Sequence, residues 1–184
     1  MIAGTLKGRL LVASPALRDP NFDRTVVLLL EHTEDGALGV VLNRPSQLDL
    51  SEALPEWGGL AIEPQVVFVG GPVQTGSLIG LAAAWTDGQV EGWTPLIGRL
   101  GAVDLEHPDA LAPGIGEVRI FSGYAGWASG QLESELEVGA WFVLDAAPDD
   151  ALSPEPERLW RTVLRRQGGR LALMASYPEN PDWN

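Results

Sequence analysis

The chain has 184 residues, enough for one domain that buries about 70% of the surface of its unfolded form. It contains no cysteine, which excludes disulfides, thiolate zinc sites, a cysteine nucleophile and thiol redox chemistry. Its net charge of −13 opposes non-specific binding to nucleic acid and to anionic membranes.

The N-terminus carries Lys7 and Arg9 before a short apolar run, a pattern that superficially resembles a signal peptide. The run is shorter than the apolar part of a signal peptide, and Arg18 follows it at once. No other segment approaches the roughly 18 apolar residues of a membrane span. We therefore expect one cytoplasmic domain over residues 1–184, with no contact to membranes.

Short apolar runs separated by turn residues predict many strands. The clearest unit is a β-hairpin, with strands at 25–31 and 37–43 and a turn that ends at Gly36. Both strands are apolar at nearly every position, so we expect both faces of this hairpin to be covered. Further strands are predicted at 10–13, 66–69, 78–84, 97–105, 118–121 and 141–144.

Helices are predicted mainly in the C-terminal part. Residues 130–138 carry Leu132 and Leu136 four apart, with Ser129 placed to cap the helix and Gly139 to end it. Residues 155–167 form an amphipathic helix whose apolar face consists of Leu159, Trp160, Val163 and Leu164. Shorter helices are predicted at 50–54 and 170–175. Strands first and helices later indicate an α+β fold with a mainly antiparallel sheet.

A glycine-rich segment follows the strand at 118–121. Its pattern is Gly123-x-x-Gly126-x-x-x-Gly130, and it contains Tyr124 and Trp127. It lacks the Gly-x-Ser-x-Gly spacing of a nucleophile elbow and the spacing of known phosphate-binding loops. A phosphate at the following helix stays open as an alternative, although glutamates there would repel it. The favoured interpretation is a tight turn from strand to helix, with the two aromatic side chains packed against the core.

Three other positions are weighed as sites. Gly70 and Gly71 could let a ligand approach the backbone, but such a pair more often ends a buried strand. His32 could serve a weak metal or proton site, but a solvated histidine at the hairpin end is favoured. Asn43 and Arg44 could bind a carboxylate or phosphate, and the favoured alternative is that the arginine holds a loop in place.

One helix is locally basic. Arginines occupy five positions within thirteen residues, namely Arg158, Arg161, Arg165, Arg166 and Arg170. Such a face could contact nucleic acid. In an acidic protein it is better explained by pairing with the acidic segment 133–137 or with an acidic partner, so direct binding to nucleic acid is disfavoured.

Four blocks of sequence together resemble the YqgE/AlgH family of small bacterial proteins. They are PALRDPNFDRTVV from Pro15, continuing to His32; the block Gly36-x-x-Gly39-Val-Val-Leu-Asn-Arg-Pro45; FVGGPV from Phe68; and Arg119-x-Phe-x-Gly-Tyr-Ala-Gly-Trp-x-x-Gly-Gln-Leu-x-x-Glu-Leu136 with Trp141. Residues 85–116 and the tail after Gly168 depart from the family's pattern.

The resemblance implies a single α+β domain with a bifurcated, partly barrel-like sheet surrounded by helices. It implies no catalytic residues, because the family's function is uncharacterised; some members are labelled transcriptional regulators through a link to alginate production. From the four blocks we select ten candidate ligand-binding residues, namely Arg24, His32, Asn43, Arg44, Gly70, Gly71, Gly123, Tyr124, Gly126 and Trp127.

Our leading hypothesis is a non-enzymatic cytoplasmic binding or regulatory protein, with a protein partner or a small anionic ligand. It rests on the absence of cysteine, of a nucleotide-binding motif and of an intact nucleophile motif. We expect neither a cofactor nor a metal. The alternative is a hydrolase or phosphate-handling enzyme that uses Ser122 or Ser129 with His32, near Arg44 and the Gly123–Gly130 segment.

Overall fold

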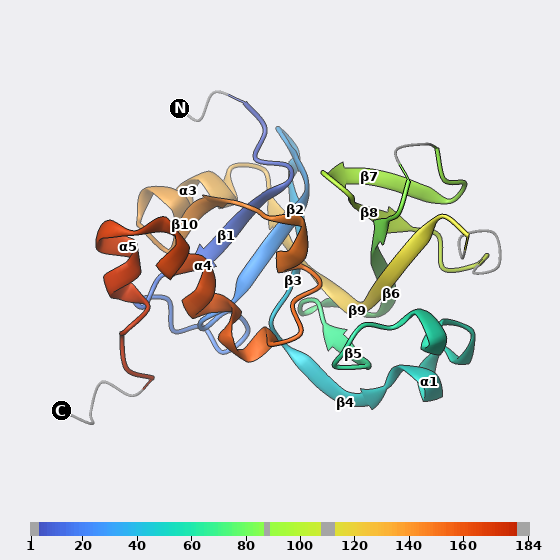
Figure 1. The fold of residues 1–184 in the computed structure, drawn as a ribbon. Coiled ribbons are helices and arrows are strands. Elements are labelled where there is room, and N and C mark those ends of the chain that lie inside the picture. Colours follow the sequence, from blue (N-terminus) through green and yellow to red (C-terminus); the bar gives the residue numbers. More distant parts are fainter. Residues whose placement is uncertain (1–3, 87–88, 108–112, 180–184) are drawn as a thin grey trace.

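The longest strand of the sheet, β9 (Ile115–Ala128), organises the fold. The computed structural model describes residues 4–86, 89–107 and 113–179. Eight strands follow one another in the order β10-β1-β2-β3-β9-β6-β8-β7, and β4 and β5 branch from this path (Figure 1). The other strands are β1 (Arg9–Ala13), β2 (Val26–Thr33), β3 (Gly36–Val41), β4 (Pro45–Asp49), β5 (Val66–Val69), β6 (Val73–Ala84), β7 (Trp93–Ile97), β8 (Leu100–Val103) and β10 (Trp141–Asp145).

The sheet forks along one edge of β9. The C-terminal part of β9 pairs with β3, whereas its middle pairs with β5 at Phe121 and Ser122. The opposite edge of β9 pairs with β6 over most of its length. Among the strand pairs of the described residues, only the β5–β9 pairing is parallel, so the predicted bifurcated, mainly antiparallel α+β fold is confirmed.

Helices cover both faces of the half of the sheet that contains β1 and β2. Leu10, Val12 and Leu28 lie in one apolar cluster with α4 (Leu159–Gln167). Leu11 and Val27 point to the other face and pack with α3 (Gln131–Glu137). The predicted hairpin with two covered faces is therefore confirmed, and alternation along each strand explains why neighbouring residues enter different clusters.

The other half of the sheet has its own apolar cluster. It joins residues of β6, β8 and β9 to α1 (Leu50–Ala53) and to the 3₁₀ helix η1 (Pro55–Leu60), which contributes the buried Trp57. The helix α5 (Gly169–Met174) follows α4, and short 3₁₀ helices occur at η2 (Pro148–Asp150) and η3 (Pro156–Arg158). Among the described residues, no helix is both long and apolar enough to cross a membrane.

Several predicted boundaries are wrong for local reasons. The strand predicted at 97–105 is a hairpin, because Gly98 takes a φ of 52° and turns the chain between β7 and β8. The strand β4 was not predicted. Ser129 does not cap α3, whose first turn follows Gly130 at a φ of 74°, while Gly139 ends the helix as predicted. The apolar face predicted for 155–167 is buried, although the regular α-helix begins only at Leu159.

Candidate functional site

A groove of about 340 Å³ lies where the sheet forks. It is lined by Asn21, Val41, Arg44, Val69, Gly71, Pro72 and Thr75. Two of the ten candidate residues, Arg44 and Gly71, therefore line the same hollow. Their positions follow from main-chain pairing, since the Val69 N–H donates to the Arg44 carbonyl at 2.8 Å and the Val41 N–H donates to the Gly70 carbonyl at 2.8 Å.

Beside this groove, two segments of the backbone cross each other at candidate glycines. Gly70 and Gly71 follow β5 and pass directly over Gly123 and Tyr124 of β9, with the Gly70 N–H donating to the Ser122 carbonyl at 2.8 Å. A Cβ on Gly71 would lie 2.1 Å from the Tyr124 carbonyl carbon, and one on Gly123 would lie 2.5 Å from the Gly71 oxygen. The glycines are therefore needed for close approach of the chain to itself.

The interpretation of residues 123–127 as a turn is wrong. These residues lie inside β9, and the chain leaves the strand only after Ala128. Gly123 has a φ of 72° and pairs opposite a bulge in β6, where four residues separate Val73 from Leu78. The sheet tolerates this irregularity because glycine adopts positive φ without steric cost. Neither a nucleophile elbow nor a phosphate-binding loop is formed here.

Tyr124 and Trp127 do not share a pocket. Trp127 is 6% exposed, packs on the α3 side and donates its indole N–H to Glu135 at 2.9 Å. Tyr124 packs against the cluster on the opposite side of the sheet. Gly126 is exposed, and a Cβ there would lie 3.7 Å from the Tyr124 ring. The strand that carries these residues separates them onto two faces.

Arg44 and Asn43 hold the loop before β2. The Arg44 guanidinium donates to the carbonyls of Pro20 at 2.8 Å and Asp23 at 3.0 Å. The Asn43 side chain accepts from the Val26 N–H and donates to the Arg24 carbonyl, both at 2.9 Å. The contacts of Arg44 are therefore those of an arginine that fixes a loop, which is the interpretation that the sequence favours. Arg44 still lines the groove, and two of the five N–H groups of a guanidinium are used in these bonds.

Arg24 lies away from the groove. It has a φ of 54°, donates to the Tyr177 carbonyl at 2.8 Å, and places its Cζ 4.6 Å from the centre of the Trp160 ring. These contacts join the loop before β2 to the chain after α5. Arg24 and Arg44 therefore act on different parts of the same loop, and only Arg44 faces the groove.

His32 is not the solvated histidine that the sequence favoured. Its side chain is 8% exposed, its Nδ1 accepts from the Leu6 N–H at 2.9 Å, and its Nε2 contacts Glu133 at 2.8 Å. The hydrogen bond from His32 lowers the pKa of Glu133. Both ring nitrogens are thus engaged, and His32 lies on the α3 side, outside the groove.

The predicted nucleophile and base are not brought together. Ser122 Oγ donates to the Thr75 carbonyl, and Ser129 Oγ donates to the Glu34 carbonyl at 2.7 Å. His32 contacts Leu6 and Glu133 instead of either serine. Hydroxyl activation needs the base within hydrogen-bond reach, so the described residues supply no serine–histidine pair.

The arginines near the C-terminus have local partners. Arg158 pairs with Glu155 at 3.3 Å, Arg161 approaches Glu179 at 4.0 Å, and Arg166 binds both carboxylate oxygens of Asp150 at 2.8 and 2.9 Å. The partners therefore differ from the predicted segment 133–137. Hydrogen bonds from Arg166 to the buried Asp150 carboxylate raise the pKa of Arg166. Arg165 and Arg170 are exposed.

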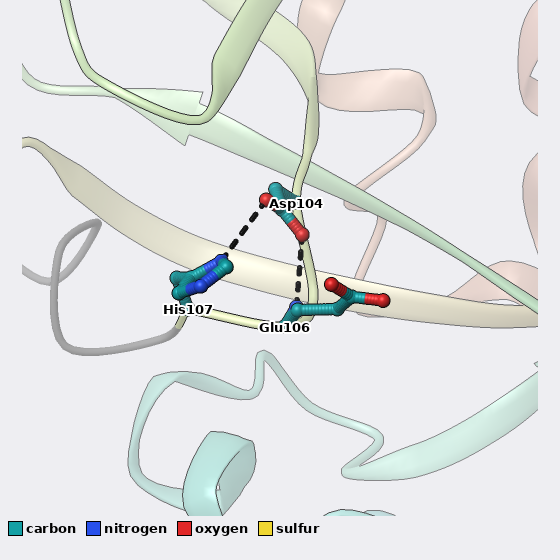
Figure 2. Close-up of side chains that lie close together, drawn as sticks. All are labelled: Asp104, Glu106 and His107. Atoms are coloured by element: carbon teal, nitrogen blue, oxygen red, sulfur yellow. Dashed lines mark hydrogen bonds and ion pairs between the residues drawn. The ribbon is translucent and has the colours of Figure 1, made fainter.

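A set of possible metal ligands lies on the loop after β8. Donor atoms of Asp104, Glu106 and His107 lie within 4.8 Å of one another, and all three residues are exposed. Figure 2 shows His107 directed toward Asp104, with the Glu106 carboxylate turned away from His107. Two hydrogen bonds lower the pKa of Asp104. The larger effect comes from the Glu106 N–H and the smaller from the His107 ring. The contacts within the cluster account for its arrangement.

A larger cavity, about 760 Å³, lies beside the β7–β8 hairpin and is lined by none of the ten candidate residues. Trp93, Pro95 and Arg99 contribute to its lining. It falls in the part of the chain that departs from the family's pattern. We therefore place the candidate site in the smaller groove, because six of its seven lining residues, all except Thr75, lie in the sequence blocks that support the resemblance.

Arg119 is a structural residue that the sequence analysis did not single out for a role. It is 2% exposed, and it donates to the carbonyls of Glu63 at 2.8 Å and Ser153 at 2.7 Å. Its Cζ lies 4.3 Å from the centre of the Phe68 ring. Burial lowers the pKa of Arg119 to about 10. In the sequence, the feature that could have indicated this structural role is the charge of Arg119 within the apolar run Val118–Phe121.

Comparisons with known proteins assign the chain to a family. Residues 10–172 match the family described as AlgH-like. This chain belongs to that family. A UPF0301 protein of Streptomyces avermitilis is 57% identical over 98% of this chain and 96% of its own length.

Two solved structures of the family share the fold. The crystal structure of a Corynebacterium diphtheriae protein has a TM-score of 0.88 at 34% identity, covering 93% of this chain and 92% of that one. The solution structure of AlgH from Pseudomonas aeruginosa has a TM-score of 0.70 at 34% identity and covers 98% of both chains. The resemblance inferred from the four sequence blocks is thereby confirmed.

Proposed function

We propose that this AlgH-like protein is a non-enzymatic binding protein of the cytoplasm, and that an extended segment of a regulated protein occupies the groove at the fork. The observation that carries the proposal is a row of exposed apolar side chains beside the groove. Val69 is 43% exposed, Val73 is 36% exposed and Leu78 is 39% exposed. Contiguous exposed apolar groups of this kind mark interaction sites more often than isolated ones do.

Strand pairing makes these side chains contiguous. Val69 of β5 and Leu78 of β6 both pair with Ser122, from opposite edges of β9. Residues paired across strands point to the same face of a sheet, so Val69, Ser122 and Leu78 form one row. Val73 pairs with Tyr124 two residues further along β9. A bulge in β6 separates Val73 from Leu78, so strand pairing places Val69, Ser122 and Leu78 in one row and Val73 at a separate pair further along β9.

The presence of Arg44 in the groove is an argument that the bound segment carries an anionic group. It lines the groove next to Val69 and retains guanidinium N–H groups beyond the two that hold the loop. Arginine binds carboxylates and phosphates through such groups. The best-fitting ligand is therefore a segment with apolar side chains and a carboxylate, with a small anion as the simpler alternative.

A regulatory role through a protein fits the charge of the chain better than direct contact with DNA. The net charge is −13, and three of the five arginines near the C-terminus are held by local acids. A protein that affects transcription can do so by binding another protein, without itself binding the phosphates of DNA. This supports a protein partner for the groove.

The test is selection of peptides from a random displayed library on the immobilised protein. We expect enrichment of acidic peptides with apolar residues, and we expect Val69→Lys to weaken a selected peptide about tenfold or more because a buried apolar contact is replaced by a charge. Arg44→Gln should weaken acidic peptides selectively. Leu173→Lys is the matched control, since Leu173 is 74% exposed on α5.

Peptides that bind Val69→Lys and the unmodified protein equally would contradict the proposed site. Turnover of generic esters or phosphoesters that disappears in His32→Ala would contradict the non-enzymatic assignment. Thermal unfolding with inorganic phosphate and nucleotides distinguishes the small anion, because a ligand at a hundred times its dissociation constant stabilises the fold by about 2.7 kcal/mol.

A further inference from the structure

His32 joins three parts of the chain on the face of the sheet opposite α4. It lies near the end of β2, pairs with Ala37 of β3, and contacts both the N-terminal segment 4–8 and α3. The N-terminal segment is further attached by Thr5, whose hydroxyl donates to the His32 carbonyl at 3.1 Å. Leu6 of this segment is 6% exposed and packs into the apolar cluster that includes Trp127 and Trp141.

The contacts define the protonation state of the imidazole. The Leu6 N–H can only donate, so His32 Nδ1 must carry a free electron pair at 2.9 Å. The ring proton therefore lies on Nε2 and is donated to the Glu133 carboxylate at 2.8 Å. This arrangement is a neutral imidazole held between a backbone donor and a carboxylate acceptor.

We propose that His32 is a pH-sensitive latch, and that protonation of its Nδ1 releases the N-terminal segment 4–8 from the sheet. A proton on Nδ1 would face the Leu6 N–H, placing two donors 2.9 Å apart. The imidazolium keeps its bond to Glu133, because Nε2 remains a donor. The contact that fails is therefore the one to the N-terminal segment, and α3 keeps its contact.

Other charged groups on the packed elements influence the balance. Glu133 of α3 favours the cation directly, whereas the Leu6 N–H opposes it. The remaining charged residues on these elements are Lys7 in the N-terminal segment, Glu31 on β2, Glu34 and Asp35 in the turn, and Glu135 and Glu137 on α3. Six of these seven groups, with Glu133 included, are acidic, and of these Glu133 contacts the imidazole.

The sign of the pH dependence follows from proton binding. The latched state leaves Nδ1 without a proton, while the released state permits one, so acidification favours release. The direction of this dependence follows from the contacts of Nδ1 alone. Glu133 acts at lower pH. Its lowered pKa means that it stabilises the fold above the ordinary glutamate range and loses that effect as pH falls through its pKa in the folded protein.

Release would alter the apolar face beneath the segment. Leu6 packs with residues of β1, β2 and α3, so its departure exposes part of the cluster that contains Trp127. This face is distinct from the groove at the fork, which lies beside Val41 and Val69. The latch therefore does not depend on the proposed function.

The experiment is an NMR titration of the full chain between about pH 8 and pH 5. We expect the hydrogen-exchange protection factor of the Leu6 amide to fall about tenfold or more, with the same midpoint as the His32 ring signals. The Ala13 amide, which donates to the Thr25 carbonyl at 3.0 Å, is the internal control and should keep its protection.

Three variants separate the latch from general acid sensitivity. Asparagine places an oxygen near the position of Nδ1 and does not titrate, so His32→Asn should retain Leu6 protection at all these pH values. His107→Asn should leave the transition unchanged, because His107 is exposed on a distant loop. Glu133→Gln should move the midpoint to lower pH, whereas Glu137→Gln should not.

Constant Leu6 protection in the unmodified protein, whether or not the imidazole titrates, would overturn the proposal. A loss of protection that persists in His32→Asn would do the same. Should His32→Asn fail to fold, the coincidence of the two midpoints in the unmodified protein decides the question alone.

Discussion

Gly123 shows how one residue permits the fork in the sheet. Its φ of 72° is strained for any side chain, and the neighbouring Gly71 oxygen leaves no room for a Cβ. The crossing at this point places the β5–β6 connection against β9 and thereby forms one wall of the groove. Gly123, which the sequence favours as part of a turn and leaves open as part of a phosphate site, instead allows two segments of the chain to cross.

We predict that Gly123→Ala destabilises the protein by at least about 1–3 kcal/mol, from positive-φ strain and overlap with the backbone of the β5–β6 connection. Urea unfolding followed by circular dichroism measures the change. Gly76→Ala is the control, because nothing lies within 4 Å of a Cβ at Gly76 and its φ is not positive. Equal stability of the two variants would show that the crossing relaxes without cost.

At the scale of elements, α3 is attached to the sheet by both apolar and polar contacts. Its seven residues bury Leu132, and two of its glutamates reach side chains on strands. One oxygen of Glu135 accepts from the indole N–H groups of Trp127 and Trp141, each at 2.9 Å. These two indoles also pack edge to face, with ring centres 6.0 Å apart. A helix this short depends on such contacts, since its own hydrogen bonds contribute little.

Glu135→Ala should therefore destabilise the protein by about 1–3 kcal/mol, because both indole N–H groups lose their acceptor. Thermal unfolding monitored by tryptophan fluorescence reports this directly. Glu137→Ala, on the exposed side of the same helix, should change stability by no more than about 0.5 kcal/mol. A Glu135→Ala variant as stable as Glu137→Ala would mean that water satisfies the indoles.

At the scale of the whole molecule, charge governs which partners can approach. The net charge is −13, and the local basic surface is reduced by the ion pairs of Arg158, Arg161 and Arg166. Arg165 and Arg170 remain as exposed cations on α4 and α5. Two exposed cations can release few counterions from a nucleic acid.

We predict no measurable binding to a short DNA duplex at protein concentrations up to about 100 μM in physiological salt, since non-specific affinity comes from neutralised phosphates. Fluorescence anisotropy of a labelled duplex measures it. The double variant Arg165→Glu with Arg170→Glu serves as the comparison. An affinity that falls steeply with salt and disappears in this variant would instead establish DNA binding through α4 and α5.

Local pattern determined much of the fold. The apolar runs of β1, β2, β3, β5 and β10 and the apolar face of α4 appear where the sequence predicts them, because burial and periodicity act within a few residues. The four sequence blocks also identified the family, and with it the bifurcated sheet. That residues 1–184 form a single domain remains a prediction.

Tertiary contacts decided the rest. Gly123 lies within a strand because the chain at Gly70 and Gly71 crosses it, and that contact joins residues more than 50 positions apart. The His32 side chain is covered because Leu6 and Glu133, which lie far from each other in the sequence, both contact it. Whether a glycine, histidine or arginine binds a ligand or its own chain depends on such distant partners, which no local pattern encodes. The sequence by itself therefore determined the elements and the family, whereas only the tertiary structure placed Arg44 in the groove and His32 between Leu6 and Glu133.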